Sequence, residues 1–475
     1  MRNKNSAFGL AVAIVGGLLS ASAANAAATI TIINGDPAGV GFNDPSAVAP
    51  VGGNPGTTLG QQRLNAFQAA ANKWGATLTA VPTLRILATF EPLTCTPTSA
   101  VLGSAGATEV FRDFPGAPLA GHWYPKSLTA KLVGADPDPA TADIRARFNI
   151  NLGQAGCLTG VPFYLGLDNN HGPLVDLVTV LTHELGHGLG FQTFTNGSNG
   201  APLAAFPSVW DHFLYDESVA LHWDEMTNGQ RATSALNNSR LVWNGALVTA
   251  AAPGVLRYGV PGVRISGPAA GAATGQYAVG TASFGAPLNT TGVTGDVMPL
   301  STATSGADGC TAFNAADRLA AAGNIVIISR GTCGFAVKAK NAQNAGALGV
   351  IIHNNAAGSP APGLGGTDPT VTIPTVSVTL ADGTTLRASL TKRSRTKSGV
   401  TGTILNDGTQ LAGASHAGFV QMYAPNPFQS GSSVSHYDVG ASPNLLMEPA
   451  INGDLTHEVQ PPNDLTFTLL QEIGW

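Results

Sequence analysis

Two histidines separated by three residues, His183 and His187, lie in the segment DLVTVLTHELGHGLG, and Glu184 directly follows the first of them. Side chains four residues apart lie one above the other on a helix, so both imidazoles can point at one metal ion. Glu184 projects at a neighbouring angle, where a carboxylate can accept a proton from an activated water without binding the metal. The spacing predicts a catalytic zinc site on a helix.

Such a site normally has three protein ligands and leaves the fourth position to water, so a third ligand is expected elsewhere in the chain. Three residues after Gly190 stands Thr193, a poor zinc ligand. The candidates that could reach the metal if the chain folded back are Asp211, His212, Asp216, His222 and His416. The residues alone leave this choice open.

The extended motif His183-Glu-Leu-Gly-His187-Gly-Leu-Gly190 resembles the metzincin superfamily of zinc proteases, and in particular its leishmanolysin-like branch. In that branch a long insertion separates the glycine from a third histidine, and a turn with a methionine beneath the metal follows. The resemblance implies His436 as the third ligand, ahead of Asp211 or His212, and Met447 as the turn methionine. Tyr437 could approach a substrate oxyanion, although an aromatic residue beside a ligand more often packs.

Several elements must position this motif. Residues 168–190 are expected to form its helix, with Leu174, Leu177, Val178, Leu181 and Leu185 on one apolar stripe. Another helix is expected at 61–75, after a Gly/Pro-rich lead-in, with Leu64, Phe67, Ala71 and Trp74 at helical spacing. Three alternating segments predict strands of one sheet: LRILATF, DIRARFNI and PFYLGL. A last helix is expected to start at Asp464 and to bury Leu465, Leu469 and Ile473.

The composition limits the possible partners and location. Residues 1–26 have the basic start, apolar run and small-residue end of a signal peptide, which predicts a secreted protein, extracellular or periplasmic. The net charge is −5 with 11% charged residues and no basic block, so nucleic acid is excluded as a partner. No later segment has the roughly 20 uninterrupted apolar residues of a membrane span. The expected partners are protein or peptide substrates.

Four cysteines in an exported chain predict two disulfides. Four cysteines allow three pairings, and their clustering in the sequence favours Cys95 with Cys157 and Cys310 with Cys333. The expected covalent framework is therefore one local bridge in each region.

A separate small domain is expected where the composition changes to Gly, Ala, Thr and Val. Its kernel, residues 324–355, reads as a strand, a turn, an Ala-rich helix and a second strand. The kernel resembles the protease-associated (PA) domain through Arg330-Gly-Thr-Cys333-Gly-Phe335, Lys338, Asn341-Ala342, Ala345-Gly-Ala347 and the strand Gly349–Ile352. The resemblance implies a lid or a docking surface, on which Lys338, Lys340 and His353 are expected to be solvated. The alternative is a purely structural spacer.

These inferences predict an α+β fold: a metzincin-like catalytic domain, with a twisted sheet and an active-site helix, interrupted by a small α/β protease-associated domain. The expected divisions are a signal peptide (1–26), an N-terminal catalytic subdomain (27–200), a connecting region (201–254), the protease-associated domain (255–411) and a C-terminal catalytic subdomain with the third histidine and the methionine turn (412–475).

The expected function is that of a secreted zinc endopeptidase with Glu184 as general base. One alternative is a catalytically silent binding protein that uses the protease-associated domain and holds a structural metal. Glu184 argues against it, because a structural site closes its fourth position and needs no base. The other alternative is a metal-dependent hydrolase of non-peptide bonds.

Overall fold

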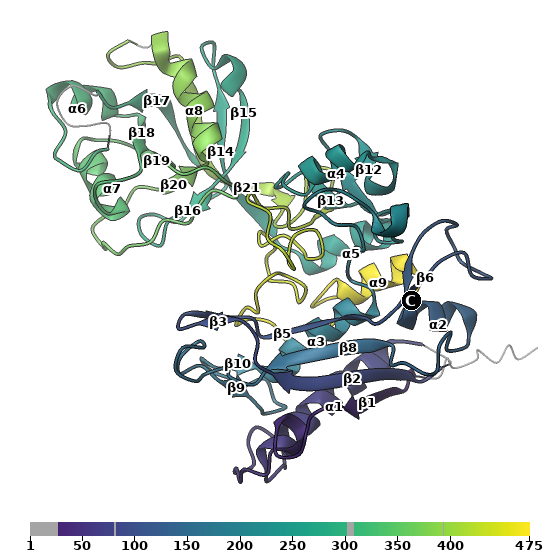
Figure 1. Cartoon of the computed structure of the whole chain (residues 1–475). Helices are drawn as coiled ribbons and strands as arrows, with labels where there is room; N and C mark the ends of the chain where they lie inside the picture. Colours follow the sequence, from purple (N-terminus) through teal and green to yellow (C-terminus); the bar gives the residue numbers. More distant parts are fainter. Residues whose placement is uncertain (1–26, 80–81, 302–307, 393) are drawn as a thin grey trace, which may run out of the picture.

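The computed structural model describes residues 27–79, 82–301, 308–392 and 394–475 (Figure 1). The expected signal peptide, residues 1–26, lies outside the described residues. In the described part of the chain, no helix has both the length and the apolar character that a membrane crossing requires.

A four-stranded mixed sheet supports the segment that carries His183 and His187. Its strands follow the order β1 (Ile30–Asn34), β2 (Leu84–Glu91), β8 (Ile144–Asn149) and β5 (Gly103–Ala107). The first three strands run parallel, and β5 pairs antiparallel with β8 at the edge. Alternate residues of β2 are buried, so one face of this sheet carries the core.

Two helices share that core. Helix α1 (Leu59–Thr77) begins at Thr58, whose side chain accepts a hydrogen bond from the Gln61 N–H, and it buries Phe67, Ala71 and Trp74. Helix α3 (Leu177–Leu189) is buried along its whole length. The two helices pack together, and the indole N–H of Trp74 donates to the carbonyl of Thr182 over 3.0 Å. Leu64 was expected on the buried side of α1, but it is 40% exposed.

The predicted α+β class is wrong, because the main sheet is of mixed α/β type. Parallel neighbours cannot be joined by a tight turn, and α1 forms the crossover between β1 and β2. Strand β1 lies inside the Gly/Pro-rich lead-in, in which no element was predicted. The segment PFYLGL does not join this sheet: β9 (Phe163–Tyr164) pairs only with β10 (Val175–Asp176).

Residues 201–254 and the C-terminal segment complete the same core. They form a small sheet in the order β12 (Leu221–His222), β11 (Leu214–Asp216), β13 (Leu241–Trp243) and β22 (Val420–Gln421). The helices here are α4 (Asn228–Ser234), α5 (Ala246–Val255) and α9 (Thr466–Ile473). Trp210, Trp223 and Trp243 are fully buried in the cluster that also contains α1 and α3. This region is therefore part of the core and more than a connector.

A second, eight-stranded sheet lies apart from the first in Figure 1, and β14 and β21 connect it with the segments that contain α5 and β22. Its order is β15 (Gly275–Ala278), β14 (Tyr258–Ser266), β21 (Thr401–Leu411), β17 (Val293–Pro299), β18 (Ile325–Ser329), β19 (Gly349–His353), β20 (Thr375–Val378) and β16 (Gly280–Thr281). Its helices are α6 (Ala315–Ala321), α7 (Phe335–Asn344) and α8 (Leu380–Ser389).

This unit differs in two ways from the small α/β domain that was expected. Strand β17 pairs antiparallel with β21 through its first half and parallel with β18 through its second, so two sheet segments merge into one. Lys338, expected on a solvated face, is fully buried, and its ammonium donates to the carbonyl of Asp308. Burial lowers the pKa of Lys338.

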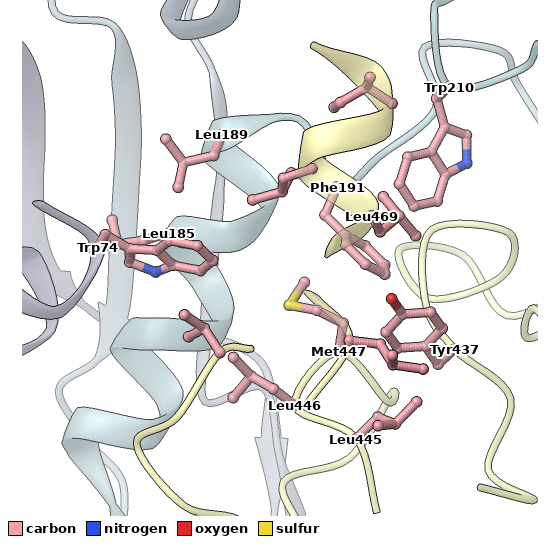
Figure 2. Packing of buried hydrophobic residues seen from close by; sticks show 14 of the residues in the cluster. Trp74, Leu185, Leu189, Phe191, Trp210, Tyr437, Leu445, Leu446, Met447 and Leu469 are labelled. Carbon is pink, nitrogen blue, oxygen red and sulfur yellow. The ribbon is translucent and has the colours of Figure 1, made fainter. Parts of the chain in front are cut away.

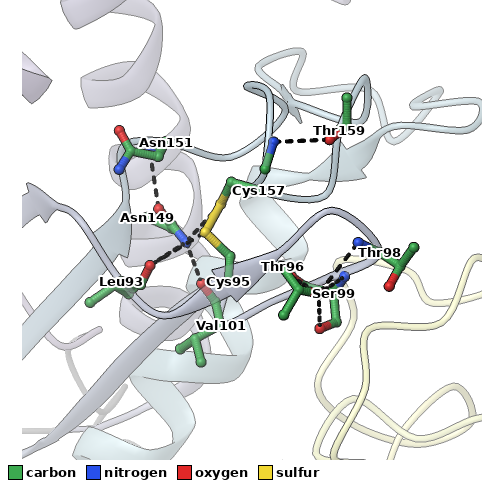
Figure 3. Close-up of a disulfide and its surroundings, with 11 residues drawn as sticks. Leu93, Cys95, Thr96, Thr98, Ser99, Val101, Asn149, Asn151, Cys157 and Thr159 are labelled. Carbon is green, nitrogen blue, oxygen red and sulfur yellow. Dashed lines mark hydrogen bonds between the residues drawn. A yellow bond between two sulfur atoms is a disulfide. The ribbon is translucent and has the colours of Figure 1, made fainter.

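The two predicted disulfides are both formed. Cys310 is bonded to Cys333, and Cys95 to Cys157. The second bridge closes the hairpin of β3 (Cys95–Thr96) and β4 (Ser99–Ala100) against the loop after β8. In Figure 3 the side-chain amide of Asn149 lies beside the bridge, and it donates to the carbonyls of Leu93 and Val101. The remaining short elements are β6 (Val110–Phe111), β7 (Tyr124–Pro125) and α2 (Lys126–Val133).

The two bridges are expected to differ in their effect on stability. They close loops of 62 and 23 residues, so restriction of the unfolded chain stabilises the protein by about 4 and about 3 kcal/mol, respectively. We expect the double variant Cys95→Ser/Cys157→Ser to lower the midpoint of denaturant unfolding more than Cys310→Ser/Cys333→Ser does. Equal or reversed losses would contradict a stabilisation set by loop length.

Candidate metal centre and cleft

Helix α3 begins at Asp176, whose carboxylate accepts the Thr179 N–H over 2.7 Å. Glycine has a low helix propensity, so Gly186 and Gly188 do not favour the helix by themselves. They allow close packing instead. A Cβ on Gly186 would lie 2.9 Å from the sulfur of Met447, and one on Gly188 would lie 2.5 Å from the side chain of Ile144 in β8. The helix ends at Gly190 with φ of +122°, a conformation that favours glycine.

The structure brings His183 and His187 together with His436, and their ligand nitrogens all lie within 4.8 Å of one another. The Nε2 atoms of His187 and His436 are 3.2 Å apart. All three side chains are at least nine-tenths buried. The third histidine comes from the C-terminal segment, which reaches α3 across 249 positions of sequence.

Each imidazole is oriented through its other nitrogen. The Nδ1 atoms of His183, His187 and His436 lie 2.7, 2.8 and 2.7 Å from the carbonyl oxygens of Leu446, Phe191 and Ser432. A carbonyl only accepts, so each Nδ1 carries the proton and each Nε2 presents a lone pair. Burial lowers the pKa of all three histidines, to about 4 for His183 and about 3 for His187, so the rings are neutral.

This donor set fits a zinc ion. Two bare Nε2 atoms cannot hydrogen-bond to each other, yet those of His187 and His436 face each other at 3.2 Å. Ligands at about 2.0 Å from a tetrahedral zinc ion are roughly 3.3 Å apart. Carbonyl groups that fix the tautomer of a ligating imidazole are the usual outer partners of such sites.

Glu184 directly follows His183 in α3. It lines the same cleft as the three histidines and is 7% exposed. Burial raises the pKa of its carboxyl group to about 8, and a hydrogen bond from the backbone of Ala105 in β5 opposes this rise. The group therefore holds a proton more readily than an exposed glutamate does.

Met447 packs against α3 at Gly186, and Figure 2 shows it among buried residues that include Leu185 and Tyr437. It is fully buried, and its carbonyl accepts the Tyr437 N–H over 2.8 Å. Tyr437 packs in the core against Phe191, with ring centroids 5.0 Å apart, and it does not line the cleft. The structure thus gives Tyr437 a packing position, away from any substrate oxyanion.

The other candidate ligands lie away from the three histidines. Asp211 is fully buried and accepts hydrogen bonds from Thr193 and Thr195. Asp216 is bonded to Asn237 and Ser218, whereas His416 is exposed. His212 contacts Asp224, and His222 contacts Glu225 and Asn244.

The histidine cluster opens into a cleft of about 1220 Å³. Residues 171–176, before α3, line this cleft, and so do Gln192, Thr193 and residues 195–197, after it. One wall is β5 with the preceding hairpin, residues 99–105. Strand β5 was not predicted from the sequence, because LGSAGA has no alternation of apolar and polar residues. Among the described residues that line the cleft there is no lysine or arginine.

One family model and several known proteins match parts of the chain. Residues 293–386 match the family model described as PA domain. The chain contains a PA domain. A stretch of 64 residues is 45% identical to Leucine aminopeptidase 2 of Arthroderma otae, covering 14% of this chain and 13% of that protein. Another, of 68 residues, is 34% identical to Minor extracellular protease Vpr of Bacillus subtilis, covering 14% and 8%. The chain therefore spans only a small part of these relatives.

Two solved structures are also similar to part of the chain. An aminopeptidase from Aneurinibacillus sp. strain AM-1 is 24% identical with a TM-score of 0.24, covering 32% of this chain and 31% of that one. BSAP, a zinc aminopeptidase from Bacillus subtilis, is 26% identical with a TM-score of 0.22, covering 34% and 36%. TM-scores this low say nothing about the arrangement of the whole chain.

These comparisons correct the expected family. The sequence matches are to a PA domain, to an aminopeptidase and to an extracellular protease, so the assignment of the chain to leishmanolysin-like metzincins is wrong. The metzincin-like description of the fold is corrected with it, in favour of a central mixed α/β sheet and a PA domain. The resemblance of residues 324–355 to the protease-associated domain is confirmed, because they lie within the matched range.

Proposed function

We propose that the protein is an exported zinc-dependent peptidase that cleaves within polypeptide chains. The observation that carries this proposal is the convergence of three neutral imidazoles and one carboxylate, Glu184, in a long cleft. His183, His187 and His436 would hold the zinc ion. The similarity of part of the chain to zinc aminopeptidases supports peptidase chemistry.

The residues of the cleft have separate tasks in this reaction. A zinc ion held by the three histidines would supply Lewis acidity, which would polarise the scissile carbonyl and lower the pKa of water. Glu184 takes the proton of the attacking water and delivers it to the leaving amine. Burial raises the pKa of its carboxyl to about 8, which favours the protonated form that delivers a proton to the leaving amine. Burial keeps the three imidazoles neutral, and the neighbouring carbonyls fix their tautomer and orientation.

Strand β5 provides a means of aligning a substrate. It pairs with β8 on one side only, and its residues Gly103, Ser104 and Ala105 line the cleft. An extended peptide can add to such a free edge through main-chain hydrogen bonds, which bind a backbone regardless of its sequence. Residues before and after α3 both line the cleft, from which we infer that a chain bound in this way extends to both sides of Glu184. This geometry favours internal cleavage.

An aminopeptidase is the second candidate, and two observations favour it. The first is the 45% identity over 64 residues with Leucine aminopeptidase 2. The second is Asp176 in the cleft wall, the one carboxylate besides Glu184 among the described lining residues, which offers an acid for a free amino terminus. Asp176 is only 2% exposed and already bonded to Thr179 and His457, so we place this candidate second.

We also propose how the chain is divided. Residues 27–200 and 412–475 form the two walls of the cleft, 201–254 complete their core, and 255–411 form the PA-domain unit. In support, β14 and β21 pair where the chain enters and leaves the eight-stranded sheet, and that sheet has its own cores. Two disulfides and an unpaired cleft edge suit an exported enzyme acting on peptides.

The test is a digest of paired peptides that differ only at their ends. One has free termini, and the other is acetylated and amidated. We expect the zinc-loaded protein to cut both internally at similar rates, a chelator to stop cleavage, and zinc to restore it. Release of single amino-terminal residues from the free peptide alone would establish the aminopeptidase instead. Absence of any metal-dependent cleavage would refute the peptidase.

A further inference from the structure

A second cluster of metal-binding side chains lies outside the cleft. His122 comes from the loop between β6 and β7, His212 from the segment after Trp210, and Asp224 from the short 3-10 turn Trp223–Glu225. Their ligand atoms all lie within 4.8 Å of one another. None of the three lines the cleft. The cluster therefore joins two segments about 90 residues apart at a place that the proposed reaction does not use.

The two carboxylate oxygens of Asp224 differ in their hydrogen bonding. Its Oδ2 atom faces both imidazoles, at 3.3 Å from Nε2 of His122 and 2.7 Å from Nδ1 of His212. Its Oδ1 atom is buried and has no hydrogen-bond partner among the described residues. An unpaired buried carboxylate oxygen is costly. A cation bound at this carboxylate would compensate for it.

His122 is oriented in the same way as the three histidines of the cleft. Its Nδ1 lies 2.9 Å from the carbonyl of Ala120 and therefore carries a proton. A neutral His122 then presents the lone pair of Nε2 to a carboxylate oxygen that can only accept. Two acceptors, Nε2 of His122 and Oδ2 of Asp224, then face each other at 3.3 Å. This distance is roughly the separation of two ligands on a tetrahedral zinc ion.

We propose that His122, His212 and Asp224 form a second metal site, which takes a divalent transition ion such as zinc. Two imidazoles and one carboxylate are a ligand set that such ions accept, and water completes the coordination. The proton is the competitor, because hydrogen bonding to Asp224 raises the pKa of His122. At low pH an imidazolium–carboxylate pair replaces the metal.

The site joins two segments of the chain next to residues that line the cleft. The loop of His122 also pairs with the other segment through Trp123, whose N–H donates to the carbonyl of Pro207 over 2.8 Å. Next to His212, Asp211 accepts hydrogen bonds from Thr193 and Thr195, which line the cleft. A metal that fixes His212 thereby fixes this part of the wall, without touching the reacting atoms.

His222 provides a matched control. Its ring is stacked on His212, with centroids 5.8 Å apart. Both of its nitrogens already have partners: Nε2 contacts the Asn244 amide at 2.8 Å, and Nδ1 contacts Glu225 at 3.3 Å. Removal of this imidazole should therefore leave the proposed site intact.

The test is a metal count on the full-length protein, loaded with zinc and separated from free ion, with mass spectrometry of the metal. We expect His212→Gln and Asp224→Asn each to hold one equivalent less than the wild type, and His222→Gln to hold the same amount. Peptide cleavage should change less than about twofold in all three, because none of these residues contacts the reacting atoms. His212 is partly exposed, so its variant should fold even if Asp224→Asn does not.

The measured quantity is a difference of one metal equivalent per protein between variant and wild type. This difference does not depend on whether the cleft site binds zinc. A protein that fails to cleave peptides can still show the loss, and His187→Ala should remove an equivalent independently. If His212→Gln retains the wild-type metal content, the cluster is an imidazolium–carboxylate network and the proposal is wrong.

Discussion

Replacement of Glu184 by glutamine should abolish peptide cleavage while the zinc content stays at the wild-type value. Glutamine keeps the size and the buried position of the side chain, but it cannot take a proton from water. Loss of a general base typically costs about 10² to 10⁴-fold in rate. The metal stays because its proposed ligands are His183, His187 and His436, each oriented by its own carbonyl. The measurement is the rate at saturating peptide, together with a metal count.

The matched control is Glu458→Gln. Glu458 pairs with Lys73 at the surface and does not line the cleft, so its loss should leave the rate unchanged. A rise in KM alone for Glu184→Gln would assign this carboxylate to substrate binding. An unchanged rate would refute its role as the base.

Replacement of His436 by alanine should remove one metal equivalent, peptide cleavage and part of the thermal stability together. His436 joins the C-terminal segment to α3, and a site assembled by folding contributes its binding free energy to stability. With free zinc at 1,000 times the dissociation constant, this contribution is about 4 kcal/mol. Unfolding of the wild type and the variant, with zinc and with a chelator, measures it. The chelator should lower the melting temperature of the wild type more than that of His436→Ala.

His416→Ala is the control, because His416 is exposed and lies outside the cluster. Its metal content, activity and melting temperature should equal those of the wild type. A His436→Ala variant that keeps both its activity and its full metal content would show that the third ligand lies elsewhere.

The sequence by itself determined the features that depend on local geometry. Residues four apart share a helix face whatever surrounds them, so the motif alone places His183 above His187. The cysteine clusters indicated the two disulfides, because bridges within a region need no knowledge of the fold. The β18–α7–β19 unit was likewise predicted from the sequence. The spacing of its apolar residues changes from the strand period of two to the helix period of 3.6 within a single segment.

Only the tertiary structure decided what depends on contacts between distant segments. The 249 positions between His187 and His436 contain no periodicity that would show which histidine returns to α3. Lys338 carries a charge and would be expected in water, yet the fold encloses it beside Asp308. Strand β5 has no apolar pattern, and its place at the edge follows from pairing with β8. Burial and pairing of this kind arise from the whole chain, because each depends on partners that the local sequence does not specify.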